Sequence, residues 1–482
     1  MQKGGPVSRY ELDEIRSLVI GLERSVPLPA GAETKYINFD NAASTPALEP
    51  VRDKVDELLE WYSSIHRGTG YKSTIATEIY EEARRVVAAF VGADPATHQV
   101  VFTVNTTVAL NRLACCLPRP ENAAVLISPM EHHSNELPWR RCCETFYLPL
   151  DETGRIDLEA AERRIAELAD RLLLVAVTGA SNITGRLTPL HELARICHAH
   201  GTRIVVDAAQ LGAHSPLDVE PAEPGAHLDF IVLAGHKMYA PFGGAAIIGR
   251  ADALESCLPA CVGGGTVKLV TRERVVWADP PELLEPGTPN VVGAVALAAA
   301  AEFLRGVGFD WIVEHERELT ARLLRGMADI DGVILYGGAD VDDLDDRLGV
   351  VSFNLDDYHH SLTAAALSYE GGIGVRNGCF CAHPYVIDLL GVDDDTFNTQ
   401  AEAMLAGDRR RILGMVRASL GLYNSPAEVD TLLELLSRLA AEGPALEYEQ
   451  DKRTGAWHPR GFRYELDGRF SFMAAKVRPA SR

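Results

Sequence analysis

Lys237 stands where an expected buried strand gives way to a glycine-rich loop. Residues 228–233 are mostly apolar and β-prone, and a turn containing Pro241 follows the lysine. We therefore expect a buried strand that ends at Gly235, His236 and Lys237. Burial disfavours the ammonium ion and lowers the pKa of a lysine, so Lys237 could form a Schiff base with a carbonyl compound. From this stretch alone, a lysine that ends a strand and extends into water is equally well supported.

Polar side chains follow other expected strands as well. Thr106 and Thr107 lie between a strand and a helix, where backbone N–H groups and hydroxyls could bind a phosphate. Threonine is also an ordinary helix N-cap, and on these two residues alone that interpretation is favoured. His132 follows the strand of residues 125–128, and a histidine on a loop is more often hydrogen-bonded than catalytic.

The order of strands and helices brings these residues together. Two apolar strands, within residues 172–185 and 202–214, flank a helix and form a βαβ pattern. This pattern indicates a mainly parallel sheet covered by helices, in which ligands bind at the carboxyl ends of the strands. Seven residues would gather at these ends: Thr106, Thr107, His132, Asn182, Asp207, Gln210 and Lys237.

This set of side chains matches the chemical needs of pyridoxal phosphate (PLP). Its carbonyl can be held by Lys237, and its phosphate by a helix start that carries hydroxyls. The pyridine nitrogen must stay protonated, which a buried carboxylate such as Asp207 ensures. The 3-oxygen requires a donor such as Asn182 or Gln210, and His132 could cover the ring while moving protons.

Composition excludes several classes of partner and site. The net charge of -22 argues against nucleic acid or an anionic membrane as the main partner. We see no signal peptide and no unbroken apolar span, the nearest candidate being the alanine-rich, helical residues 291–304. The nine cysteines have no metal-ligand spacing and are too few for a disulfide scaffold. We therefore expect a cytoplasmic protein with reduced thiols and no metal site.

Many ordered blocks of the sequence, from about Tyr36 to about Leu439, resemble one known family. This is the class V aminotransferase group of fold-type I PLP enzymes, and the nearest resemblance is to the group II cysteine desulfurases and selenocysteine lyases. The blocks are FDNAAS, HRGTG with ATEIYEEAR, VFTVNTT, MEHHSNELPW, SNITG, VDAAQ, GHKMYAPFGG, EPGTPN, VRNGCFC and RASLGLYNSPAEVD.

The resemblance implies a role for each matching residue. Lys237 would hold PLP covalently. Thr106, Thr107 and His236 would contact its phosphate, and His132 would contact its ring. Asn182 and Gln210 would contact the phenolic oxygen, and Asp207 would contact the pyridine nitrogen. Thr288 would reach the phosphate in the neighbouring subunit, which implies a homodimer with shared active sites.

On the substrate side, the resemblance places the substrate carboxylate on Arg417, with Arg376 close by. A guanidinium fork suits a carboxylate, so this assignment is also chemically sensible by itself. We also expect Asn41, in the polar turn after the first short strand, to contact the substrate.

Cys381 aligns with the persulfide-forming position of the family, and Cys379 is an additional thiol. A cysteine on a loop near PLP can ionise in part and attack the sulfur of a bound cysteine. The alternative is that both are small buried apolar residues, as free cysteines often are. In an extended loop, residues i and i+2 point the same way, so the two thiols could substitute for one another.

The resemblance implies an α/β protein of PLP transferase fold type I. A large domain, residues 36–290, would carry a mostly parallel seven-stranded sheet covered by helices, and residues 291–440 would form a smaller α+β domain. Residues 1–35, with an amphipathic helix expected over 8–25, would join the small domain. Residues 441–482 would be a strand-like extension that packs on the small domain or at the dimer edge.

We expect a PLP-dependent cysteine desulfurase that converts L-cysteine to L-alanine, leaves a persulfide on Cys381 and passes the sulfur to an acceptor protein. Another class V reaction, such as C–S cleavage without a persulfide, transamination or epimerisation of another amino acid, would not need Cys381. A non-catalytic PLP-fold protein is disfavoured because Lys237 and Asp207 are both present. Four departures from the family pattern bear on the substrate: Ala234 for serine, Asn105 for glycine, and the TGYKS and CFC blocks.

Overall fold

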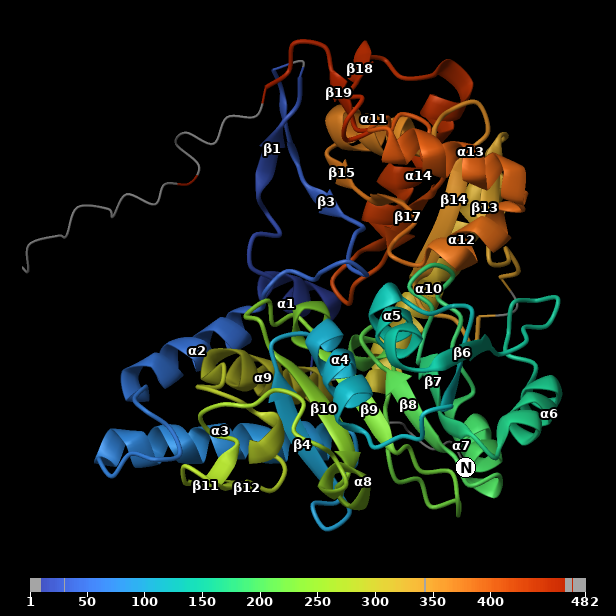
Figure 1. Ribbon diagram of the computed structural model, residues 1–482. Coiled ribbons are helices and arrows are strands. Elements are labelled where there is room, and N and C mark those ends of the chain that lie inside the picture. Colours follow the sequence, from blue (N-terminus) through green and yellow to red (C-terminus); the bar gives the residue numbers. More distant parts are fainter. Residues whose placement is uncertain (1–9, 30, 342–343, 464–469, 471–482) are drawn as a thin grey trace, which may run out of the picture.

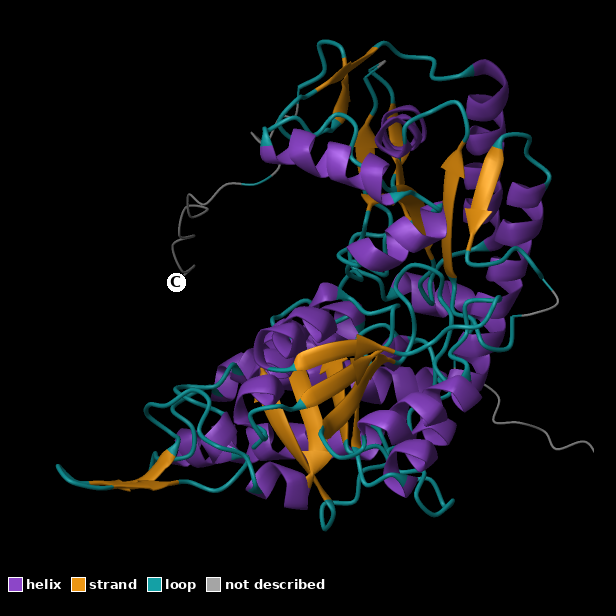
Figure 2. Ribbon diagram, turned by 45° about the vertical axis from the view of Figure 1, so that its right-hand side comes forward, coloured by secondary structure: helices purple, strands orange, loops and turns teal. Residues whose placement is uncertain are grey.

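A computed structural model describes residues 10–29, 31–341, 344–463 and 470 of the chain. The described residues form a large domain with a small domain above it in Figure 1, and Figure 2 shows the large sheet between two layers of helices. Both domains contribute residues to the cavity described below. The positions of the strand ends decide which side chains meet in that cavity.

The large domain is built on a seven-stranded sheet in the order β4-β10-β9-β8-β7-β5-β6. The strands are β4 (His98–Thr103), β5 (Ala124–Ile127), β6 (Glu144–Tyr147), β7 (Leu172–Thr178), β8 (Arg203–Asp207), β9 (Phe230–Ala234) and β10 (Ala245–Arg250). Only β10 runs antiparallel to its neighbours, β4 and β9. The mostly parallel sheet that we expected is therefore confirmed.

Side chains along the central strands alternate between the two faces of the sheet. Val206 and Ile231 belong to the apolar core on one face, whereas Val205 and Val232 belong to the core on the other. This period of two is what a pleated strand imposes. Both cores are apolar because helices cover both faces, as parallel sheets require.

Different helices cover the two faces of the large sheet. The first face packs on α2 (Glu49–Trp61), α3 (Tyr71–Phe90), α6 (Leu158–Leu168), α7 (Leu190–Ala199) and α9 (Val291–Val307). The second face packs on α4 (Thr106–Cys116), α5 (His133–Cys142) and α8 (Ala251–Glu255). Short 3₁₀ turns occur at η1 (Leu211–Ala213), η2 (Gly235–Lys237) and η3 (Glu282–Leu284).

The small domain holds a four-stranded antiparallel sheet in the order β13-β14-β17-β16. Its strands are β13 (Val333–Tyr336), β14 (Val350–Leu355), β16 (Arg376–Gly378) and β17 (Met415–Ser419). Its helices are α10 (Phe309–Ala328), α11 (His360–Gly371), α12 (His383–Leu390), α13 (Asp394–Leu405) and α14 (Pro426–Glu442). A separate apolar core, which includes Leu323, Phe353 and Leu432, joins α10, β14 and α14.

The observed domain boundary differs from the expected one. The helix α9, which we had placed in the small domain, packs against α2 and α3 of the large domain. Its buried face is rich in alanine, which allows the close approach of these helices. Gly308, with φ 92°, ends α9, and α10 leaves at a bend of 79° into the small domain. The small domain therefore begins near residue 309.

The N-terminal helix is shorter than predicted. We expected a helix over residues 8–25, of which residues 8 and 9 lie outside the described residues, and α1 covers only Leu12–Ser17 of the rest. Beyond it, the Ile20 N–H donates to the carbonyl of Ala47, and Val19 forms a bridge with Leu48. These backbone bonds replace further helical turns. The chain continues through β1 (Ser25–Pro27), β2 (Glu33–Lys35) and β3 (Ile37–Asn38), and β3 pairs with β15 (Ile373–Gly374) of the small domain.

The C-terminal extension forms a hairpin of β18 (Tyr448–Gln450) and β19 (Trp457–Pro459) on the small domain. Glu370 of α11 accepts hydrogen bonds from the Ala445 N–H and from the Tyr448 hydroxyl, at 3.0 Å each. For residues up to 463, the expected packing on the small domain is thus observed, and the later part of the predicted extension, apart from Phe470, lies outside the described residues.

A second hairpin, β11 (Val267–Val270) and β12 (Val275–Trp277), lies at the edge of the large domain away from the small one (Figure 1). Its Leu269, Val270, Val275 and Trp277 are exposed. Among the described residues, no single helix is both long and apolar enough to cross a bilayer. The helices α9 and α10 meet these criteria only when they are taken together across their bend.

Candidate active site

A cavity of about 210 Å³ lies at the carboxyl ends of β4, β5, β7, β8 and β9, where the small domain meets the large one. It contains every residue that we predicted for PLP except Thr288. Its lining residues are Ala42, Ala43, Asn105, Thr106, Thr107, His132, Ser134, Thr178, Asn182, Asp207, Ala209, Gln210, His236, Lys237, Arg376, Phe380, Cys381 and Arg417. Strand ends in a parallel sheet thus gather these residues as expected.

Lys237 enters the cavity from η2, directly after β9. The side chain does not extend into water. Burial lowers the pKa of Lys237 to about 8, although the charge of Asp207 acts in the opposite direction. About a tenth of its amine is therefore unprotonated at pH 7, far more than for an ordinary lysine, as a nucleophilic lysine requires.

Asp207 ends β8 and is only 4% exposed. Its Oδ1 atom accepts a hydrogen bond from the Ala209 N–H at 3.0 Å. Burial raises the pKa of Asp207, and the cation of Lys237 opposes this rise. A buried carboxylate of this kind suits a protonated ring nitrogen, which would neutralise its charge.

The start of α4 offers a place for a phosphate. Asn105 caps the helix by accepting a hydrogen bond from the Val108 N–H at 2.8 Å, which explains how this residue replaces the glycine of the family pattern. The hydroxyl of Thr106 is buried and has no hydrogen-bond partner within the described structure. Thr107 contacts Ser134 through their hydroxyls at 2.7 Å. A phosphate would satisfy the Thr106 hydroxyl and the free N–H groups of this helix start.

His132 is the N-cap of α5. Its Nδ1 atom accepts a hydrogen bond from the Ser134 N–H at 3.1 Å, so the ring carries its proton on Nε2. Burial and the cation of Lys237 lower the pKa of His132 to about 3. The ring is therefore neutral, can stack on a planar cofactor, and can give a proton only from Nε2.

Arg417 lies on β17 and is only 2% exposed. Its guanidinium donates to Oδ1 of Asp40 at 3.1 Å and to the carbonyl of Asn182 at 2.9 Å, while its Nε has no partner among the described residues. Burial lowers the pKa of Arg417 to about 10, against the effect of Asp40. Arg376 is more exposed, and its Nη1 is 3.7 Å from Oδ2 of Asp40. The two arginines thus face the cavity around one shared carboxylate.

The loop between β16 and α12 holds both cysteines, but it separates them. Phe380 and Cys381 have φ angles of 49° and 57°, so the loop is not extended. Cys381 is exposed and lines the cavity. Cys379 is buried in the small domain, where its thiol donates to the carbonyl of Leu413 at 3.2 Å, and burial raises its pKa to about 11. The expectation that the two thiols point the same way is therefore wrong.

Two predicted site residues lie outside this cavity. Asn41 is fully buried, and its amide nitrogen donates to the carbonyl of Ser419 at 3.0 Å while its oxygen accepts from the Tyr423 hydroxyl at 2.6 Å. It joins the turn after β3 to the small domain and does not line the cavity. Thr288 lies on an exposed loop after η3, so its predicted contact with a neighbouring subunit stays a prediction.

Sequence reasoning missed three residues that shape the site. Asp40 orients both arginines, Ser134 contacts Thr107 and His132, and the ring of Phe380 lies 4.8 Å from the Arg417 guanidinium. Asp40 and Phe380 are adjacent in sequence to residues that were chosen, Asn41 and Cys381. A neighbouring position was thus identified, but the direction of each side chain depends on backbone angles that the pattern does not reveal.

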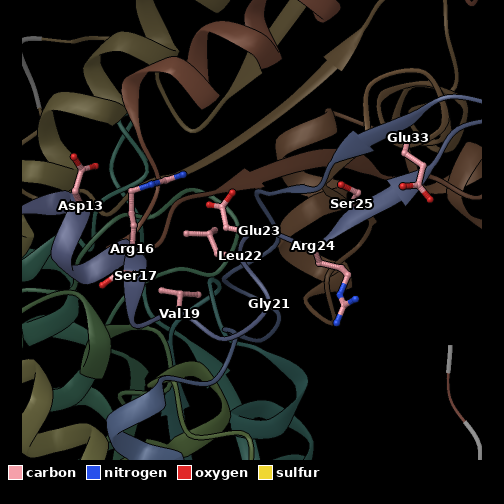
Figure 3. A pocket seen from close by; sticks show the side chains of 10 residues that line it. All are labelled: Asp13, Arg16, Ser17, Val19, Gly21, Leu22, Glu23, Arg24, Ser25 and Glu33. Atoms are coloured by element: carbon pink, nitrogen blue, oxygen red, sulfur yellow. The ribbon is translucent and has the colours of Figure 1, made fainter.

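Two other features of the molecule resemble binding sites. A hollow of about 850 Å³ lies beside α1 and the β1–β2 hairpin (Figure 3), but its Arg16 is already bound to Glu428 at 2.8 Å. At the amino ends of β8 and β9, His198, His227 and Asp229 have their ligand atoms within 4.8 Å of one another. The two imidazoles stack with centroids 4.0 Å apart and planes 15° apart, so one ion could not lie in both ring planes. We assign no metal to this cluster.

Comparison with known proteins decides the family. The model of the family "Aminotransferase class-V" matches residues 37–432. This chain belongs to the class-V aminotransferase family. As a class-V aminotransferase it is 33% identical over 434 residues to a probable cysteine desulfurase of Halalkalibacterium halodurans, covering 88% of this chain and 97% of the relative. It is 34% identical over 413 residues to a cysteine desulfurase of Haloferax volcanii, covering 84% of this chain and 89% of the relative.

Solved structures agree with this class-V assignment. The apo structure of a cysteine desulfurase from Thermococcus onnurineus has a TM-score of 0.77 at 31% identity, covering 90% of this chain and 99% of that one. The cysteine desulfurase CsdA (S-sulfonic acid) from Escherichia coli has a TM-score of 0.72 at 27% identity, with the same coverage. The expected family and fold are confirmed. The family is PLP-dependent, and the partnerless Thr106 hydroxyl and the buried Asp207 fit that cofactor.

Proposed function

We propose that this protein is a PLP-dependent cysteine desulfurase, which converts L-cysteine to L-alanine and retains the sulfur on Cys381. One observation carries the proposal: an exposed thiol, Cys381, shares a cavity with the amine of Lys237 and the guanidinium of Arg417. These are the three groups that such a reaction needs, namely a holder of the cofactor, a holder of the carboxylate and a sulfur acceptor.

PLP, when bound, supplies an electron sink that weakens the bonds at Cα and Cβ of an amino acid. Lys237 would hold its carbonyl and Asp207 would keep its ring nitrogen protonated, while Thr106, Thr107 and His236 would hold the phosphate. His132 would cover the ring, and Asn182 and Gln210 each retain an N–H for the phenolic oxygen, because each amide donates one of its two hydrogens to a backbone carbonyl.

Arg417 would bind the substrate carboxylate and thereby orient the amino acid. Its position is set before substrate arrives, because Asp40 and the carbonyl of Asn182 already fix its plane. Such preorganisation reduces the ordering cost of binding. Arg376, which is more exposed, would supply a second cation near the entrance.

Lys237 and Cys381 would carry the proton and sulfur steps. The unprotonated amine of Lys237 can remove the Cα proton of the substrate and later return protons to carbon. The Cys381 thiolate attacks the substrate sulfur, so one S–S bond forms as the Cβ–S bond breaks. The electron pair of that bond remains with the substrate, and a proton completes the methyl group of alanine.

Incubation of the PLP-loaded protein with L-cysteine tests the proposal. We expect one alanine for each sulfur removed, and a mass gain of one sulfur atom on the peptide that contains Cys381. Pyruvate with no persulfide would instead identify a C–S lyase, and a keto acid formed with an amino acceptor would identify an aminotransferase. Either product pattern would contradict the desulfurase.

Three further features belong to this proposal. A homodimer with shared sites is supported by the exposed position of Thr288 and by the exposed apolar side chains on β11 and β12. An acceptor protein would take the sulfur from Cys381, which lies at the surface. A cytoplasmic location is supported by nine cysteines that are all free, since disulfides are rare in that compartment.

A further inference from the structure

Two histidines face each other beside Cys381, one from each domain. His133 is the first residue of α5 in the large domain, and His383 is the first residue of α12 in the small domain. Their rings stack with centroids 4.9 Å apart and planes 5° apart. Nε2 of His133 lies 3.2 Å from Nδ1 of His383 and 3.3 Å from the backbone nitrogen of His383.

The hydrogen bonds define which ring is the donor. The backbone N–H of His383 can only donate, so Nε2 of His133 must be an acceptor. The ring of His383 shares this one acceptor lone pair when its proton lies on Nδ1, so two donors of His383 converge on Nε2 of His133. Partial burial lowers the pKa of both rings, which favours this neutral pair, and Glu136 and Arg140 are the other charged groups near them.

The backbone beside this pair is held in an uncommon conformation. Phe380 and Cys381 both have positive φ, which disfavours residues other than glycine, so contacts outside the loop must stabilise it. The His133 N–H donates to the carbonyl of Cys381 at 2.7 Å, and the Asn182 amide donates to the carbonyl of Phe380 at 2.9 Å. The large domain thus holds two consecutive carbonyls of the loop.

We propose that the side chains of His133 and His383 form a clamp that holds the Cys381 loop of the small domain against the large domain. Both act as positioning residues. The clamp rests on the proposed function, in which the thiol must stand at a fixed place to receive sulfur. His133 uses its backbone to hold the Cys381 carbonyl and its ring to hold His383, so it fixes the loop at Cys381 and again two residues later.

Four substitutions separate the clamp from general packing. His383→Ala removes the Nδ1–H donor and leaves the backbone N–H of residue 383 in place, and His383→Phe keeps a stacked ring without the Nδ1–H donor. His383→Asn retains an N–H donor near the position of Nδ1, and His133→Gln retains an acceptor near Nε2. Hydrogen exchange of the PLP-loaded protein would be followed on the peptides that contain Ala382 and His133, whose amides bond to Cys379 and Cys381.

Loss of one hydrogen bond at a partly exposed site should increase local opening, and hence exchange of these amides, about two- to fivefold. We expect this for His383→Ala and His383→Phe, whereas His383→Asn and His133→Gln should stay within about twofold of the original protein. Exchange in β8 and β9 should be unchanged in all four. In the desulfurase assay, kcat should fall in His383→Ala and His383→Phe. KM for cysteine should stay the same in both, because Arg417 is untouched.

Unchanged exchange in both His383→Ala and His383→Phe would overturn the clamp, and so would equal acceleration in His383→Asn. If His383→Ala does not fold, the comparison of His383→Phe with His383→Asn decides by itself. Failure of the proposed function has a different signature. The original protein would then yield no persulfide on Cys381, while the exchange measurements would still report whether the histidines hold the loop.

Discussion

Cys379→Ala and Cys381→Ala should have opposite consequences, although only one residue separates the two thiols. Cys379 is buried, and its pKa of about 11 means that about one thiol in a thousand is ionised at pH 8. The thiolate is the nucleophile in sulfur transfer, so Cys379 would react about a thousandfold more slowly than a fully ionised thiol even if it could reach the substrate. Cys381 is exposed and lines the cavity.

Cys381→Ala should therefore still bind PLP and cysteine but lose at least about 99% of alanine formation, because Cys379 cannot replace the lost nucleophile. Cys379→Ala should keep most of the activity. Its cost should appear in stability, since the buried thiol donates to the carbonyl of Leu413 at 3.2 Å, and loss of such a bond lowers the free energy of unfolding by about 1 kcal/mol.

The assay is alanine quantification after incubation with L-cysteine, together with mass spectrometry of the peptide that contains both cysteines. Fragmentation of this peptide locates the additional sulfur on Cys379 or Cys381. Cys381→Ser serves as a control of similar size. Sulfur found on Cys379, or substantial alanine formation by Cys381→Ala, would refute the reasoning from burial and loop geometry.

Lys237→Ala should be colourless after PLP addition and inactive, and a covalent PLP adduct in this variant would contradict the assignment. Asp207→Asn should bind PLP but lower kcat by orders of magnitude, because the ring nitrogen would lose the carboxylate that keeps it protonated; normal turnover would place that carboxylate elsewhere. With a lowered pKa of about 8, Lys237 is protonated and unreactive at lower pH, so the rate of PLP uptake by the apoprotein should rise with pH from 6 and level off above about 8 by stopped-flow absorbance. Arg417→Lys should raise KM for cysteine about 10- to 100-fold, as one charged hydrogen bond of the fork is lost; an unchanged KM would exclude Arg417 as the carboxylate ligand.

The positions of the cofactor residues could be predicted because their signals are local. A buried strand that ends in a glycine or a polar turn is visible in a few residues, and a parallel sheet brings all such ends to one edge. Lys237, Asp207 and Thr106 were found in this way, and all three line the cavity. Their chemistry follows from burial, which the apolar strands before them already indicate.

The remaining features depend on contacts between distant segments or on single backbone angles. The expected helix over 8–25 stops at Ser17 because the following residues bond to Ala47 and Leu48. The side chains of Cys379 and Cys381 diverge because two residues between β16 and α12 have positive φ. Neither the early end of the helix nor the positive φ angles can be read from the spacing of apolar residues in the sequence. Asp40 was missed for the same reason, since its partner Arg417 lies 377 positions away.

Asn182 connects the three parts of the active site. Its side chain lines the cavity that would hold the cofactor, its amide nitrogen donates to the carbonyl of Phe380 in the cysteine loop, and its own carbonyl accepts from Arg417 at 2.9 Å. Arg417 and the loop belong to the small domain, whereas Asn182 follows β7 of the large domain. Movement of the small domain would therefore displace the carboxylate ligand and the sulfur acceptor together relative to the cofactor. The distance between the substrate carboxylate and the thiol is then set within the small domain, and the contacts of Asn182 and His133 across the domain interface set the distance of both from Lys237.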